Sequence, residues 1–247
     1  MALNGCGFML AAVALVGGAS GAFAQASPVI SAAVADTGRP AADVARDAAR
    51  KPAEMLAFAG LKPGDVVLEI LPGGGYFTRV ISKTVGPKGH VYAGAPTGKM
   101  QEAAAAIAAD PAYANVSVVG LDAAALAPLP PVDAIWTSQN YHDLHLTRVH
   151  LDPVAIDKLW FSKLKPGGVL IIIDHVALPG APVVATADAL HRIDPAAARK
   201  EVESAGFVFD GESQALRNPA DPHTANVFDP SIRGKTDQFA FRFRKPG

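Results

Sequence analysis

The chain has 247 residues, of which 50% are hydrophobic and 18% are charged. This composition excludes a disordered chain, and the length suits one domain or at most two. With 22 Lys and Arg against 23 Asp and Glu, the formal net charge of −1 gives no overall attraction to nucleic acid or anionic lipid. The single cysteine, Cys6, excludes a disulfide framework and a metal site built from several cysteines.

The N-terminal segment carries no charged side chain over residues 1–35. An apolar run over 8–16 is followed by small residues and by an Ala-Phe-Ala motif at 22–24, which has the form of a signal peptidase site. The run is too short to span a bilayer comfortably. We therefore expect a signal peptide over 1–24, a linker over 25–38, a periplasmic or secreted location, and no membrane association after cleavage. An uncleaved anchor or a misassigned start codon is the alternative, because no Lys or Arg precedes the apolar run.

From residue 39 to 247 the pattern predicts a single domain in which strands and helices alternate. Apolar segments bounded by turn residues predict strands over 65–70, 90–93, 116–119, 132–137 and 169–173. Helices are expected over 40–58, 76–85, 98–109, 152–164 and 194–205. Alternating phenylalanines predict that 207–209 and 238–243 close the sheet as an antiparallel pair. The expected fold is α/β: a doubly wound, mostly parallel seven-stranded sheet with helices on both faces and an antiparallel last strand.

A glycine-rich turn follows the first expected strand. The strand ends in Glu69, and the turn contains Gly73, Gly74 and Gly75. Glycines allow the backbone to approach a ligand closely, and the helix that begins at Tyr76 offers free N–H groups. In a doubly wound sheet, such a turn lies at the carboxyl ends of the strands, where ligands bind. A tight turn without a ligand is the alternative, because three glycines alone are weak evidence.

This turn resembles motif I of the class I S-adenosylmethionine-dependent methyltransferases, in which an acid is followed by three alternate glycines. The resemblance covers about residues 48–245, and residues 164–170 (LKPGGVL) are similar to that family's turn into the fifth strand. Residues 140–145, 191–195 and 233–239 resemble a bacterial group of predicted methyltransferases that often carry signal sequences.

The resemblance implies a Rossmann-like methyltransferase fold and S-adenosylmethionine as the cofactor. It assigns cofactor contacts to Glu69, Gly73, Gly74, Gly75 and, for the adenine amino group, Asp122.

Two positions depart from the family pattern. Leu71 stands where the first glycine of motif I is expected, and Ala95 stands near the place of an acid that would hold both ribose hydroxyls. A site that loses such a bidentate carboxylate loses roughly 1.5–3 kcal/mol, or one to two decades of affinity.

Histidines and acids cluster after the fourth and fifth expected strands. His142 and Asp143 follow the fourth strand, and Asp174 and His175 close the fifth. Both places lie at the carboxyl edge, beside the glycine turn. Because a histidine titrates near neutrality, we predict His142 as a general base oriented by Asp143 or Asp174, with His175 and His191 as second choices. Loop histidines bonded to the backbone are the alternative.

A metal site competes with this interpretation. His142, His145, Asp174 and His175 are of the residue types that bind Zn²⁺ or another divalent ion. A His-x-x-His spacing in a loop does not define a site, so the sequence prediction includes no metal.

Together these patterns predict a methyltransferase that acts on an unknown, small-molecule acceptor. The alternatives are an exported, non-catalytic binding protein on the same scaffold and a metal-dependent enzyme that uses the histidine cluster. The segment over 216–236 is longer than most connections and is predicted to cover the substrate. Arg46, Arg50 and Lys51 are expected on a solvated helix face.

Overall fold

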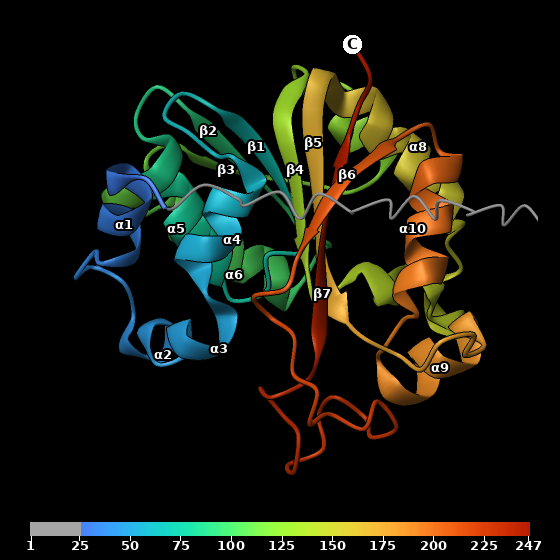
Figure 1. The fold of residues 1–247 in the computed structure, drawn as a ribbon. Coiled ribbons are helices and arrows are strands. Elements are labelled where there is room, and N and C mark those ends of the chain that lie inside the picture. Colours follow the sequence, from blue (N-terminus) through green and yellow to red (C-terminus); the bar gives the residue numbers. More distant parts are fainter. Residues whose placement is uncertain (1–25) are drawn as a thin grey trace, which may run out of the picture.

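A seven-stranded sheet forms the centre of the structure, a computed structural model that describes residues 26–247 (Figure 1). The strand order is β3-β2-β1-β4-β5-β7-β6. The strands are β1 (Val66–Ile70), β2 (His90–Gly94), β3 (Val116–Val119), β4 (Val132–Ser138), β5 (Leu164–His175), β6 (Val208–Ser213) and β7 (Gln238–Arg244). Strands β1 to β5 pair in parallel, whereas β7 lies antiparallel between β5 and β6. The predicted fold class, including the antiparallel last strand, is confirmed.

Helices cover both faces of this sheet. The α-helices are α1 (Pro28–Val34), α2 (Ala41–Val44), α3 (Asp47–Arg50), α4 (Pro52–Ala59), α5 (Tyr76–Val85), α6 (Lys99–Ala108), α7 (Ala123–Leu126), α8 (Pro153–Lys163), α9 (Val183–Leu190) and α10 (Pro195–Ser204). Three short 3-10 helices complete the described elements: η1 (Pro111–Tyr113), η2 (Tyr141–His145) and η3 (Thr147–Val149). Within the described residues, no helix has the length and apolar character needed to cross a bilayer.

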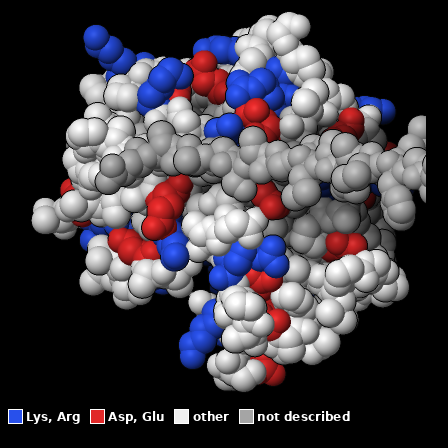
Figure 2. All heavy atoms as spheres, in the orientation of Figure 1, with Lys and Arg blue, Asp and Glu red and all other residues white. Residues whose placement is uncertain are grey.

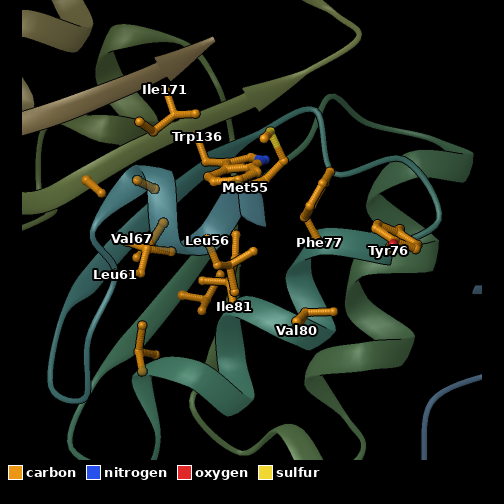
Figure 3. Packing of buried hydrophobic residues seen from close by; sticks show 14 of the residues in the cluster. Met55, Leu56, Leu61, Val67, Tyr76, Phe77, Val80, Ile81, Trp136 and Ile171 are labelled. Carbon is orange, nitrogen blue, oxygen red and sulfur yellow. The ribbon is translucent and has the colours of Figure 1, made fainter. Parts of the chain in front are cut away.

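Two hydrophobic clusters hold the layers together. On one face, side chains of α4 and α5 surround Trp136 of β4, and Figure 3 shows Met55 and Phe77 beside its ring. The Phe77 and Trp136 ring centroids are 4.7 Å apart. On the other face, Trp160 of α8 and Phe243 of β7 belong to a second cluster. Because the central strands are buried on both faces, they read as continuous apolar runs in the sequence.

The N-terminal part of the domain differs from its prediction. Residues 28–34, expected within a linker, form α1, whose Ile30 and Ala33 are buried in the first cluster. The single helix expected over 40–58 is instead divided into α2, α3 and α4. Lys51 adopts a left-handed conformation with φ of 43° before Pro52. Proline disfavours helical geometry in the residue before it, which explains the break between α3 and α4. The predicted signal peptide lies outside the described residues.

The carboxyl ends of β1, β4 and β5 meet at one edge of the sheet because these strands are parallel. Figure 1 shows α2, α3 and α9 at that end, together with the orange-to-red segment that joins β6 to β7. On the face drawn in Figure 2, basic and acidic side chains are interspersed. The fold therefore gathers one long connection and several short helices around the edge where a ligand is expected.

Candidate functional site

A cavity of about 470 Å³ opens at the carboxyl ends of β1, β4 and β5. The glycine turn, α3, the start of α5, η2 and the connection before β7 all contribute to its wall. The residues that line it include Arg50, Glu69, Leu71, Gly73, Gly74, Tyr76, Asn140, His142, Asp143, Arg148, His175, His191, Val227 and Phe228. The topology thus brings together most of the site residues predicted from sequence.

The three glycines of the turn have different roles. A Cβ atom added at Gly73 or Gly74 would meet no heavy atom within 4 Å, and both residues line the cavity. At Gly75 the added atom would lie 2.0 Å from Cδ1 of Ile107 in α6. Gly73 and Gly74 therefore form an open cradle, whereas Gly75 packs against α6 and has a positive φ of 80° that favours glycine. Leu71, which replaces the expected first glycine, has a positive φ of 54°.

Glu69 is a buried acid at the end of β1. Its side chain accepts a hydrogen bond of 2.5 Å from the Thr78 hydroxyl. Burial raises the pKa of Glu69 to about 7, although Thr78 and the positive charges of Arg50 and Arg79 favour ionisation. A buried carboxylate beside an open cradle is suited to bind a cationic group.

His142, which lines the cavity, forms a buried pair with Asp174, which does not reach the cavity wall. His142 Nδ1 lies 2.8 Å from Asp174 Oδ1. The same carboxylate accepts hydrogen bonds from the backbone N–H groups of His142 (2.7 Å) and His175 (2.8 Å). Because a carboxylate only accepts, the Nδ1 of His142 carries the proton and leaves Nε2 free to act. Asp174 is therefore the group that orients His142.

The titration of this pair follows from two opposed effects. Burial alone would raise the pKa of Asp174, but the charge and hydrogen bonds of His142 hold it below the ordinary value. Burial opposes protonation of His142, and the Asp174 carboxylate outweighs it, so the pKa of His142 is raised. His142 is thus a tightly held, basic imidazole.

The other predicted catalytic residues lie in the same cavity. Asp143 Oδ1 lies 3.4 Å from His142 Nε2, and burial raises the pKa of Asp143. His175 Nδ1 lies 2.7 Å from the Thr236 hydroxyl. Burial lowers the pKa of His175 to about 4, so this imidazole is neutral at physiological pH.

Two predicted site residues lie elsewhere. His145 Nε2 lies 3.1 Å from Glu201 of α10, outside the cavity wall, so the metal cluster expected from His142, His145, Asp174 and His175 is not assembled. Asp122 is exposed and caps α7 by accepting a 2.8 Å hydrogen bond from the Ala125 N–H. Its carboxylate is therefore partly engaged in starting a helix.

Several residues of the cavity were missed by the sequence reasoning. Arg50 was expected on a solvated face, but its guanidinium lies over the Tyr76 ring, 4.8 Å from the centroid, and donates to Gln139 Oε1. Burial lowers the pKa of Arg50 to about 10. The break at Pro52 was the available signal, because it turns α3 and Arg50 over the edge of the sheet. Nothing local singled out Arg148, which also lines the cavity.

The connection before β7 is tied down beside the cavity. Arg192 forms a salt bridge of 2.8 Å with Asp221, and both side chains are fully buried. Further along, Val227 and Phe228 line the cavity, and the Phe228 ring lies 4.9 Å from that of His191. This placement agrees with a cover over a bound substrate, which stays a prediction.

A family model described as protein-L-isoaspartate(D-aspartate) O-methyltransferase matches residues 42–176. This segment includes the glycine turn, η2 and the end of β5. The chain belongs to this family. The predicted recognition of a class I S-adenosylmethionine-dependent methyltransferase, and of its cofactor, is thereby confirmed at the level of the family.

Individual relatives agree with this assignment. A protein-L-isoaspartate O-methyltransferase of Ignicoccus hospitalis is 35% identical over 121 residues, which are 49% of this chain and 52% of the relative. The chain thus spans about half the length of this curated relative. A methyltransferase structure from Aquifex aeolicus is 22% identical, with a TM-score of 0.61, over 81% of this chain and 93% of the other. Aeropyrum pernix fibrillarin with bound S-adenosylmethionine gives 15% identity and a TM-score of 0.51, over 80% and 76% of the two chains. The two solved structures support the fold.

The described residues fit the methionine end of S-adenosylmethionine. Gly73 and Gly74 leave space for it, and Glu69 and Arg50 offer opposite charges for its ammonium and carboxylate groups. The nucleoside end has fewer partners, because Ala95 is fully buried and carries no acid. A Cβ at Gly94 would lie 2.6 Å from the Leu121 side chain, which shows how closely this part of the edge is packed.

Proposed function

We propose that the protein transfers a methyl group from S-adenosylmethionine to a carboxylate oxygen of a small acid or of a flexible peptide. The observation that carries the proposal is a cavity whose wall contains the glycine cradle, Glu69, His142 and the cation Arg148. The family's description, which names isoaspartate, supports a carboxylate acceptor. A cavity of about 470 Å³ has room for the methionine end of the cofactor and a small acceptor group.

The residues of this chain act by binding and orientation. When bound, S-adenosylmethionine supplies an electrophilic methyl group. Glu69 and Arg50 hold the charged end of the cofactor, and Arg148 attracts an anionic acceptor to the other end of the cavity. Val227 and Phe228, from the connection before β7, shield the bound acceptor from water. Alignment of donor and acceptor accounts for most of the catalysis that such a transfer requires.

A second candidate acceptor is a hydroxyl group or another protonated nucleophile. The observation that favours it is the His142–Asp174 pair, because a carboxylate is already ionised at neutral pH and needs no base. In this case His142 Nε2 accepts the proton of the acceptor, while Asp174 holds the imidazole.

One experiment distinguishes the acceptors. The purified protein is incubated with methyl-labelled S-adenosylmethionine and, in separate reactions, an isoaspartyl peptide, its aspartyl counterpart, small dicarboxylic acids and small phenols. A carboxylate acceptor gives a methyl ester that releases labelled methanol in mild alkali, whereas a methylated phenol keeps its label. Calorimetric titration with the cofactor alone provides the first control. Absence of binding at millimolar S-adenosylmethionine would contradict the proposed function.

Export remains part of the proposal. It is supported by the signal-peptide pattern over residues 1–24, and N-terminal sequencing of the protein from its host tests it. A mature chain that begins at residue 25 is the expected result, and an intact N-terminus in a cytosolic fraction would contradict it.

A further inference from the structure

Three side chains of the cavity point ligand atoms at one another. His142, Asp143 and His191 each offer one nitrogen or oxygen atom, and these atoms all lie within 4.8 Å of one another. The Asp143 Oδ1 atom lies 3.4 Å from His142 Nε2 and 3.8 Å from His191 Nδ1. A carboxylate acceptor needs no base, so the proposed function leaves the role of this cluster open.

The spacing of the three atoms fits a metal ion. Bonds of about 2.0–2.1 Å in tetrahedral geometry place two ligand atoms roughly 3.4 Å apart. The separation of 3.4 Å matches this value and that of 3.8 Å is slightly longer, so movements of side chains whose ligand atoms already lie within 4.8 Å of one another would close the set around an ion. Two imidazoles and one carboxylate suit Zn²⁺ or another divalent transition metal, whereas Mg²⁺ prefers oxygen ligands.

The surroundings also resemble those of metal-binding histidines. A histidine that binds a metal through one ring nitrogen almost always donates its other N–H to a carboxylate or a carbonyl. Asp174 accepts from His142 Nδ1 at 2.8 Å and is itself held by two backbone N–H groups. The atom left free on His142 is Nε2, which is the one that faces Asp143.

The third ligand comes from another part of the chain. His191 ends α9 in a left-handed conformation with φ of 54°, and its backbone N–H donates to Ala187 at 3.0 Å. All three ligand residues line the cavity, so further coordination positions face the space where an acceptor enters. Arg148 lies in the same wall and opposes a cation, whereas the Asp143 and Asp174 carboxylates together balance a divalent charge.

We propose that His142, Asp143 and His191 bind one divalent transition metal ion, with Asp174 as the group that positions His142. The ion leaves open positions toward the cavity. This step rests on the proposed function: an acceptor oxygen takes one of these open positions, beside the methyl donor. The ion and a proton compete for the same lone pair of His142 Nε2, so the metal-bound protein does not use His142 as a base.

Zinc titration of the chelator-treated full chain tests the proposal. We expect one Zn²⁺ per chain by metal analysis and calorimetry, and a visible absorption band of a four- or five-coordinate ion with Co²⁺. His191→Asn, which keeps a residue that tolerates the left-handed conformation, removes a ligand and is expected to lower affinity at least 100-fold. His150→Asn is the matched control, because His150 is exposed and has a similar φ of 50°. We expect the His150→Asn variant to bind Zn²⁺ with the affinity of the wild type.

Asp174→Asn tests the positioning role separately. Loss of such an outer carboxylate is expected to weaken metal binding 10- to 100-fold and to alter the Co²⁺ spectrum. Circular dichroism shows whether each variant is folded. No Zn²⁺ binding by the wild type, or equal affinity in wild type and His191→Asn, would overturn the proposal. Titration of the same samples with S-adenosylmethionine distinguishes failure of the metal proposal from failure of the proposed function, because cofactor binding at Glu69 and Gly73 does not require the ion.

Discussion

The edge of the sheet has two halves that differ in how they are built. The half beyond β1, β2 and β3 consists of a glycine turn and tightly packed small residues, with Glu69 as its buried acid. The half beyond β4 and β5 holds the His142–Asp174 pair, Asp143 and His191. The first half depends on backbone conformation, which neighbouring residues determine. The second depends on side chains from distant segments, and His191 lies beyond the residues that match the family.

The two halves also differ in how far the family match covers them. The family match at residues 42–176 contains the whole glycine turn and ends at β5. The covering segment and the third candidate metal ligand come after it. Glu69, the glycine turn, His142 and Asp174 therefore all lie within the family match, whereas His191 and the covering segment lie outside it. Following the proposed function, we call the half with the glycine turn the cofactor half and the half with His142 the acceptor half. The following variants test this comparison.

The largest expected effect is on the anchor of the acceptor half. Arg192→Met leaves Asp221 buried without its partner, which is expected to cost about 3–5 kcal/mol of the free energy of unfolding. Arg244→Met is the matched control, because both side chains of its salt bridge with Asp210 are partly exposed (45% and 26%) and Asp210 keeps Arg242 as a partner, so its loss is expected to cost about 1 kcal/mol or less. Urea unfolding measures both. Equal losses would show that the buried pair is not a special anchor.

The buried acid of the cofactor half is expected to reduce stability as pH rises. The folded pKa of Glu69, about 7, lies above its ordinary value of 4.5, so the folded state binds the proton more tightly than the unfolded state. The tighter proton binding stabilises the folded state fully below pH 4.5, and this stabilisation is lost as the pH rises through 7. Glu69→Gln should therefore gain up to about 3 kcal/mol relative to wild type between pH 4 and 8. The same variant should bind S-adenosylmethionine more weakly. A stability difference that does not change with pH would contradict the assignment.

Filling the glycine cradle should reduce cofactor binding beyond the strain that any side chain brings at the positive φ of Gly73. Gly73→Arg places a long side chain in the cavity, and we expect at least a 100-fold loss of cofactor affinity, about 2.7 kcal/mol. Gly64→Arg controls for strain, since Gly64 also has a positive φ and open space around an added Cβ. Calorimetry measures affinity, and thermal unfolding compares stability. Comparable affinities in the two variants would mean that the cofactor does not occupy the cradle.

The smallest expected effect is at the tip of the cover. Phe228→Ala removes a side chain that is 58% exposed, so the free energy of unfolding should change by less than about 0.5 kcal/mol. Because Phe228 lines the cavity, we expect a several-fold rise in KM for the acceptor with unchanged cofactor affinity. Steady-state kinetics with the acceptor that the labelling experiment identifies measures this change. A change confined to cofactor affinity would place Phe228 in the other half.

Part of the site was predictable because its signals are local. The strand that ends in Glu69, the glycine turn and the helix that begins at Tyr76 follow one another directly. Parallel topology then predicts that His142 and Asp174 meet at one edge, and they do. The helix expected over 40–58 ignored Pro52, and the chain break at this proline is what brings Arg50 into the cavity. His145 and Asp122 had suitable chemistry, but other partners hold them, as Glu201 and the Ala125 N–H show.

By itself, the amino-acid sequence determined the alternation of strands and helices, the sheet and the cofactor turn, because apolar periodicity and glycine act over a few residues. Only the tertiary structure decided which charges meet. His145 and Glu201 are 56 residues apart, and Arg192 and Asp221 are 29 apart. Such pairs depend on how helices and connections pack over the sheet edge, and burial then makes each pairing energetically decisive.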